Sequence, residues 1–105
     1  MNEDTKIILS WDTDSNAAQF RAGLDFHPDS QEWFRWLNEP CTQKFTFEVY
    51  NQFEFFSFHA EKDSDENWWL SWKGSRGEYC IKLGYGRALT LKELVVGTQK
   101  LLTNE

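Results

Sequence analysis

Alternation of apolar and polar side chains in residues 44–83 constrains the fold more than any other feature of this sequence. Large apolar residues occupy every second position in residues 45–49, 68–72 and 79–83. A period of two places neighbouring side chains on opposite faces of a β-strand. We therefore expect this segment to form several strands, each with one face turned toward a core.

Turn-forming residues divide this segment into strands. Residues 50–52, Tyr-Asn-Gln, predict a tight turn and hence a β-hairpin. Residues 62–67 form a charged loop, and residues 74–77, Gly-Ser-Arg-Gly, supply the backbone freedom that a second hairpin needs. Four strands between Lys44 and Leu83 are therefore expected to follow one another as an antiparallel meander.

The second of these strands carries large apolar residues in both phases of the alternation. Phe53 and Phe55 share one phase, and the residues in the other phase are Phe56, Phe58 and Ala60. A one-residue β-bulge would produce such a change of phase. Burial of both faces of the strand would account for it equally well.

Two shorter apolar runs and a helix signal precede the meander. Residues 6–11 and 17–24 lie on either side of an Asp-rich turn and predict a strand followed by a weaker strand. Asp29, with Glu32 three positions later, has the arrangement of a capping box, which predicts a short helix near residues 30–38.

A second helix is expected at the C-terminal end. Thr90 and Glu93 form another capping box. The apolar residues that follow at helical spacing are Leu91, Leu94, Val95, Leu101 and Leu102. The predicted fold is therefore α+β: an antiparallel β-sheet meander packed against a C-terminal helix, with a second short helix near residues 30–38, in one domain over residues 1–105.

Composition supports a soluble globular chain. Six Trp, nine Phe and three Tyr supply enough apolar surface for a core without disulfides or metal. No apolar run approaches the roughly 18–20 residues of a membrane span. Because the first residues, MNEDTKIIL, lack the basic leader of a signal peptide, we expect a cytoplasmic protein that does not bind membranes.

Residues suited to catalysis or to metal binding are sparse. His27 and His59 are the only histidines, and neither lies in a known nucleophile motif. Cys41 and Cys80 lack metal-ligand or CxxC spacing, so we expect free thiols. The segment Gly84-Tyr85-Gly86 lacks the continuation of a dinucleotide-binding loop. We therefore expect no enzyme activity, no metal and no cofactor.

Charge is divided unevenly along the chain. Residues 1–66 contain fourteen acidic and five basic side chains, a net charge of −9, whereas residues 67–105 contain three acidic and six basic ones, a net charge of +3. One interpretation is a basic working face in the C-terminal half. The other is a chance imbalance among solvated side chains.

A candidate binding face follows from the strand pair 68–83. The alternation places Trp69, Ser71, Lys73 and Lys82 opposite the core-facing set, together with Cys80. Arg76 lies at the hairpin tip and Arg87 in the loop that leaves the sheet. An exposed Trp among cations stacks on bases while the cations pair with phosphate.

The alternative is that this face is covered. Trp69 would then lie beneath the N-terminal helix that bears Trp33 and Trp36. In that case the cations would be ordinary edge residues that discourage aggregation.

The order of features resembles the N-terminal leader module of large bacterial LuxR/MalT-type transcriptional regulators, as a stand-alone version. The segments that carry the resemblance are Ile8-Leu9-Ser10-Trp11, Trp33-Phe34-Arg35-Trp36-Leu37, the Phe-rich hairpin, Ala60-Glu61-Lys62, Trp68-Trp69-Leu70-Ser71-Trp72, Leu83-Gly84 and Leu89-Thr90-Leu91. The resemblance covers nearly the whole chain and implies a regulatory role without a settled activity.

The strand–strand–strand–helix order is also similar to the small DNA-binding sheets of integrase arm domains and plant AP2-type factors. That similarity implies a sheet in the major groove. The sequence departs from the basic pattern: Cys80 and Ile81 stand where a Lys/Arg pair is usual, and Glu61 where an Arg is common. Fewer cations imply weak, salt-sensitive binding.

We therefore expect a non-enzymatic regulatory binding module, with DNA as a candidate partner of the sheet formed by residues 67–84. The alternative is a protein–protein interaction module that uses an exposed aromatic sheet face, since aromatic side chains dominate interface energetics.

Overall fold

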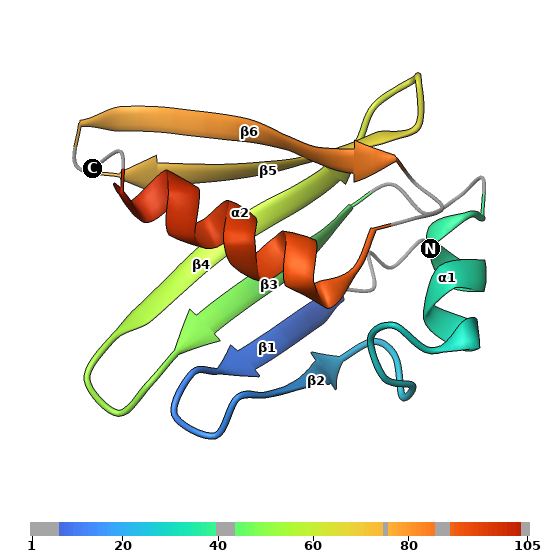
Figure 1. Cartoon of the computed structure of the whole chain (residues 1–105), viewed down its shortest axis with the longest axis horizontal. Helices are drawn as coiled ribbons and strands as arrows, with labels where there is room; N and C mark the ends of the chain where they lie inside the picture. The colour runs from blue at the N-terminus through green and yellow to red at the C-terminus, as the bar shows by residue number, and fades with distance from the viewer. Residues whose placement is uncertain (1–6, 40–43, 75, 86–88, 104–105) are drawn as a thin grey trace, which may run out of the picture.

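In the computed structural model, which describes residues 7–39, 44–74, 76–85 and 89–103, six strands form one sheet that packs against helices (Figure 1). The elements are β1 (Ile8–Asp12), β2 (Ala17–Ala22), α1 (Gln31–Leu37), β3 (Lys44–Tyr50), β4 (Phe55–Lys62), β5 (Asn67–Gly74), β6 (Gly77–Tyr85) and α2 (Leu91–Thr103). The predicted α+β class, with a C-terminal helix and a second short helix, is confirmed. Neither described helix is long and apolar enough to cross a membrane.

The strands lie in the order β2-β1-β3-β4-β5-β6. Strands β3 to β6 form the predicted antiparallel meander. The prediction omitted a parallel pair, because β1 lies beside β3 with Leu9 opposite Phe47. After the β1–β2 hairpin the chain passes through α1 and returns on the free side of β1, and such a crossover connection is what parallel neighbours require.

Strands β3 and β4 pair without a bulge. Their register is continuous from Lys44 opposite Glu61 to Tyr50 opposite Phe55. The bulge considered from the sequence is therefore wrong, and Phe53 belongs to the loop before β4. Phe55 and Phe56 simply point to opposite faces, as neighbours in a strand do.

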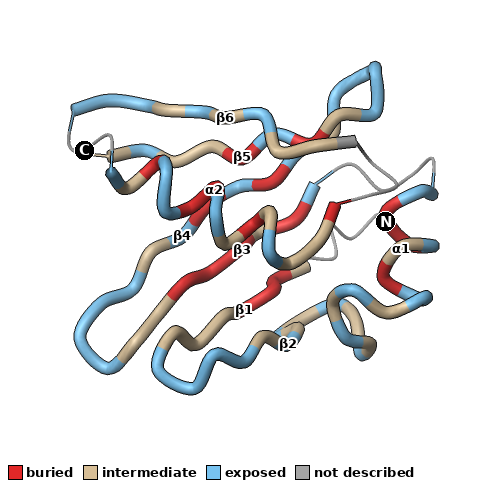
Figure 2. The backbone as a smooth tube through the Cα atoms, viewed as in Figure 1, coloured by how far each residue is buried: buried red, intermediate tan, exposed pale blue. Residues whose placement is uncertain are grey.

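One face of the sheet carries the hydrophobic core. Leu9, Phe47 and Phe58 lie next to one another on adjacent strands and are fully buried. Helix α2 lies across this face (Figure 1), and its buried side is formed by Leu94, Gly97, Thr98 and Leu101. Figure 2 shows the buried positions concentrated on the central strands, with further buried positions on α1 and α2.

Helix α1 packs on the same face as α2. The Trp33 ring lies 6.0 Å from that of Phe20 and 5.9 Å from that of Phe45, and Trp33 Nε1 donates to the Leu89 carbonyl at 2.8 Å. Phe45 is opposite Ala60, which is opposite Leu70 in the core face. Both helices therefore cover one side of the sheet, and the alternative in which α1 covers Trp69 is wrong.

The start of α1 also differs from the capping box expected at Asp29. Ser30 is the N-cap, and its hydroxyl accepts from the Trp33 N–H at 3.2 Å. Asp29 adopts a positive φ of 66°, and its carboxylate accepts from the Leu91 N–H at 2.9 Å. The Asp29 side chain therefore supports the first turn of α2, where a negative charge is favourable.

Candidate functional site

The predicted binding residues on β5 and β6 share the face of the sheet that the helices leave open. Leu70 faces α2, since its side chain lies close to Gly97, so Trp69 and Ser71 point the other way. Trp69 is opposite Lys82, and Ser71 is opposite Cys80. The structure thus brings Trp69, Ser71, Lys73 and Lys82 together on one face, which we call the open face.

Of the two remaining predicted residues, the structure describes only Arg76. Arg76 is exposed in the turn between β5 and β6. Arg87 lies outside the described residues, as does Cys41. Cys80 is an exposed free thiol.

Trp69 is held by a carboxylate. Its Nε1 donates to Asp63 Oδ2 at 2.8 Å, and the other oxygen of Asp63 accepts from the backbone N–H groups of Asp65 and Asn67 at 2.9 and 3.0 Å. The Asn67 hydrogen bond and then the Trp69 hydrogen bond hold the pKa of Asp63 below its ordinary value. The Trp69 side chain, 36% exposed, is therefore presented beside a fixed negative charge.

The cations of the open face also have acidic neighbours. Lys73 is opposite Glu78, and the positive charge of Lys82 contributes to the lowered pKa of Asp63. Glu61 lies opposite Trp69 on its other side. The basic face expected from the sequence is thus a surface of mixed charge, because the pairing of the strands places acidic residues between the cations.

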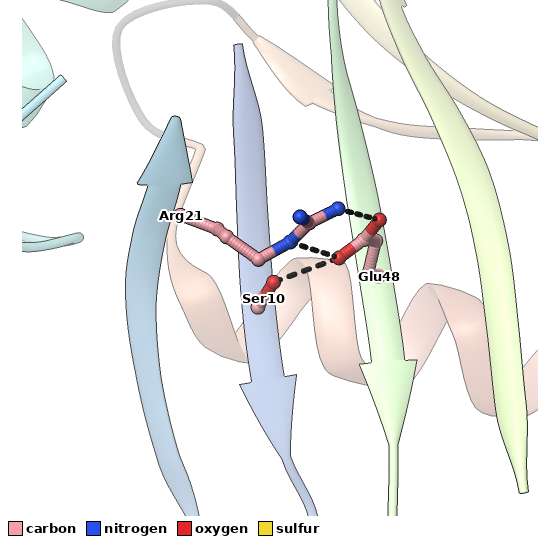
Figure 3. A network of polar contacts seen from close by, with 3 residues as sticks. All are labelled: Ser10, Arg21 and Glu48. Carbon is pink, nitrogen blue, oxygen red and sulfur yellow. Dashed lines mark hydrogen bonds and ion pairs between the residues drawn. The ribbon is translucent and has the colours of Figure 1, made fainter. Parts of the chain in front are cut away.

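A polar network that the sequence analysis missed lies on the open face at β1, β2 and β3 (Figure 3). Arg21 Nε and Nη2 donate to the two carboxylate oxygens of Glu48 at 3.1 and 2.8 Å, and Ser10 Oγ donates to Glu48 Oε1 at 2.9 Å. The hydrogen bonds from Arg21 to Glu48, and then the charge of Glu48, raise the pKa of Arg21. This bidentate pair connects the edge strand β2 to β3 across β1 and satisfies a buried carboxylate.

Among the described residues, the most exposed large apolar side chains lie at the end of the β3–β4 hairpin. Phe53 is 84% exposed in the loop, and Phe55 is 60% exposed at the first position of β4. Phe55 points to the open face, because it is opposite Tyr50 whereas Phe56 is opposite Val49 of the core. We call Phe53 and Phe55 the aromatic tip.

Hydrogen bonds fix the loop that carries the aromatic tip. Asn51 Oδ1 accepts from the N–H groups of Phe53 and Glu54, both at 2.8 Å, and the Asn51 N–H donates to the Glu54 carbonyl at 2.9 Å. The Gln52 N–H also donates to Asp14 Oδ2, at 3.2 Å, in the neighbouring β1–β2 turn. The loop is thus held from both sides, which restricts the positions open to the Phe53 ring.

The surroundings of the aromatic tip are acidic. Asp14 and Glu54 lie in the two turns that hold it, and Asp12 is the last residue of β1. Neither residues 12–16 nor residues 50–55 include a Lys or an Arg. The Asn51 turn was predicted from the sequence, but Phe53 was placed in the following strand. The asparagine itself was the available signal, since Asn side chains form such turns with the backbone N–H two residues on.

Groups suited to metal binding do not converge in the described part of the chain. His27 is exposed in the loop before α1 and His59 is exposed on β4, and no group of three potential metal ligands is formed among the described residues.

Comparisons with protein-family models, with curated proteins and with solved structures find no match for this chain. The resemblance to a LuxR/MalT-type leader module stays a prediction.

Proposed function

We propose that this protein is a protein-interaction module that contacts its partner through the aromatic tip and the adjoining open face. The observation that carries the proposal is the exposure of Phe53 and Phe55, at 84% and 60%, on a loop fixed by hydrogen bonds. Aromatic side chains that enter a pocket of the partner supply much of the binding energy at interfaces. A loop that is already ordered loses less entropy on binding.

Charge indicates the chemistry of the partner. The aromatic tip is flanked by Asp12, Asp14 and Glu54 with no neighbouring cation in the two turns. A complementary surface has an apolar pocket for the Phe53 ring and lysine or arginine residues at its rim. The partner we propose is therefore a protein with a basic-rimmed apolar pocket.

The same charges favour a protein partner over DNA. A nucleic-acid surface needs cations that are free to neutralise phosphates. Here the Asp63 carboxylate accepts a hydrogen bond from Trp69, and Glu78 lies opposite Lys73. A DNA duplex brought to the open face would meet these carboxylates, so DNA is the less favoured partner. A regulatory role, which the family resemblance implies, remains a prediction.

Site-specific cross-linking tests the proposal. The photo-reactive residue p-benzoylphenylalanine replaces Phe53 in the full chain, which is irradiated in cells of the source organism. We expect one discrete adduct with a second protein, whose cross-linked segment borders lysine or arginine. The matched control carries the same label at Gln31, an exposed position on α1, and gives no such adduct.

Charge reversal shows whether the contact depends on the proposed complementarity. Glu54→Lys is expected to lower the yield of the adduct from position 53 several-fold, since it places a cation against the basic rim. Equal adduct yields from positions 53 and 31 would contradict the proposal. So would an adduct yield that Glu54→Lys does not change. Cross-linking to a second copy of the chain, or to nucleic acid, would also overturn it.

A further inference from the structure

A shallow groove lies between α2 and the edge strand β6. It consists of two adjoining hollows of about 420 and 260 Å³ that share Ile81, Val96 and Lys100. Val96 is 37% exposed and is one of the few large apolar side chains at the surface. The groove is on the covered side of the sheet, at its edge, and is separate from the aromatic tip.

The floor of the groove is apolar. Ile81 is opposite Leu70 in the core face, and Leu83 approaches Gly97 of α2, so both side chains point to the helix side of β6. Since β6 is the last strand of the sheet, no further described strand covers Ile81 and Leu83 from outside. An apolar strip therefore remains partly uncovered along β6 and α2.

The rim of the groove is basic. Lys92 and Lys100, both exposed on α2, are eight residues apart, about two turns of the helix. Among the described residues that line the groove, Glu93 is the acidic one, and its carboxylate accepts from the Thr90 N–H at 3.0 Å at the start of α2. In the described part of the chain neither of these two lysines forms an ion pair. The groove thus concentrates positive charge on a protein whose net charge is −6.

The outer edge of β6 adds a backbone site. Strand β6 pairs with β5 alone among the described strands. An edge strand presents unpaired N–H and C=O groups along its free side, and extended peptides bind by adding to such an edge.

We infer that this groove binds an acidic extended segment of a partner protein, which adds to β6 as a seventh strand. Its apolar side chains lie on Ile81, Leu83 and Val96, and its carboxylates pair with Lys92 and Lys100. This site goes beyond the proposed function, because it accepts a peptide on a surface remote in sequence from the aromatic tip.

A synthetic peptide provides the test. The probe is a fluorescein-labelled, end-capped octapeptide of alternating Glu and Val, and the comparison peptide has Lys in place of Glu. Fluorescence anisotropy with the full chain measures both dissociation constants at low and at physiological salt. We expect the acidic peptide to bind, more weakly as salt rises, and the basic peptide not to bind.

Variants of the protein locate the site. The double change Lys92→Glu and Lys100→Glu is expected to weaken binding about tenfold, which corresponds to two exposed ion pairs. The matched control, Arg35→Glu with Lys44→Glu, alters the net charge equally at exposed positions away from the groove and should leave binding within about twofold. Circular dichroism checks that both variants fold. Equal losses in the two variants would overturn the inference.

Backbone methylation of the peptide tests strand addition directly. A probe with N-methyl groups on alternate residues cannot donate hydrogen bonds from those positions, and we expect it to lose binding when the methyl groups face β6. Methyl groups on the other alternate residues should leave binding intact. Equal binding of the two methylated peptides, or no preference for the acidic peptide, would contradict the inference. A Phe53→Ala chain should bind the probe normally, so this result is independent of the aromatic tip.

Discussion

The two faces of the sheet differ in what their side chains do. On the covered face, Trp33, Phe47 and Leu94 are fully buried between the strands and the two helices. On the open face, the buried side chains of Ser10 and Glu48 are polar, and Glu48 accepts hydrogen bonds from both Ser10 and Arg21. Stability therefore comes mainly from one face, and Trp69, Phe55 and the adjoining Phe53 are exposed away from that face.

Of the substitutions that test the difference between the two faces, truncation of Trp33 should lower stability most. Trp33→Ala is expected to lower the free energy of unfolding by about 3–5 kcal/mol, because it removes a fully buried ring and its hydrogen bond to Leu89. Urea denaturation followed by circular dichroism measures the change. Trp69→Ala on the open face is the matched control, with an expected loss below about 1 kcal/mol. Similar losses for both variants would remove the distinction between the faces.

Overpacking beneath α2 should have the next largest effect on stability. A Cβ at Gly97 would lie 2.5 Å from Leu83 Cδ2 and 3.3 Å from Leu70 Cδ2. Gly97→Leu should therefore destabilise the protein by about 2 kcal/mol, despite the roughly 1 kcal/mol that a better helix former contributes. Thermal melts of the variants measure this change. Val96→Leu, one position earlier and partly exposed, should leave the stability nearly unchanged in these melts. A Gly97→Leu chain as stable as the parent would show that α2 does not pack closely there.

Loss of the Arg21–Glu48 pair should destabilise the protein less than Gly97→Leu does. Arg21→Ala removes the cation that pairs with the buried Glu48 carboxylate, and we expect a loss of stability smaller than that of Gly97→Leu, because the Arg21 side chain is 60% exposed. Arg21→Lys should recover part of this loss, since one charged hydrogen bond replaces two. Chemical denaturation of the parent chain and of the two variants measures these losses. If Arg21 were an ordinary surface residue, neither substitution would change the free energy of unfolding.

The smallest effect concerns Asp63 and Trp69. Hydrogen bonds from Asn67 and Trp69 lower the pKa of Asp63 in the folded chain. The ionised carboxylate therefore stabilises the fold, and this stabilisation is fully present at pH values above the pKa of Asp63 in the unfolded chain, about 4. That contribution is lost as the pH falls through the folded pKa. Trp69→Phe should move the pKa of Asp63 upward, toward its ordinary value, in a carboxyl-detected NMR titration. An unchanged titration would mean that the indole N–H does not hold this carboxylate.

Local pattern predicted much of the fold but not its non-local pairings. The alternation in residues 44–83 identified the meander, because strand period is a local property. The parallel pairing of β1 with β3 depends on where the chain returns after α1, which no local pattern encodes. Likewise Asp29 and Ser30 are both good N-cap residues, and the contact between Asp29 and Leu91 decides that Ser30 caps α1.

The open face around Trp69 was predictable in position but not in its charge. Side-chain alternation placed Trp69 and Lys73 on one face, and the structure has them there. Their acidic neighbours come from register: Glu78 lies opposite Lys73, and the Asp63 loop folds back onto Trp69. The exposure of Phe53 was missed because an aromatic residue beside a strand is ordinarily assigned to the core.

The affinity of the doubly substituted chain Phe53→Ala and Phe55→Ala for the protein cross-linked from position 53 tests the account most directly. We predict that the dissociation constant rises at least about a hundredfold, as the loss of two interface anchors implies, while the free energy of unfolding changes by less than about 0.5 kcal/mol. Unchanged affinity, or a loss of affinity that merely follows a loss of folding, would contradict the assignment of binding to the aromatic tip.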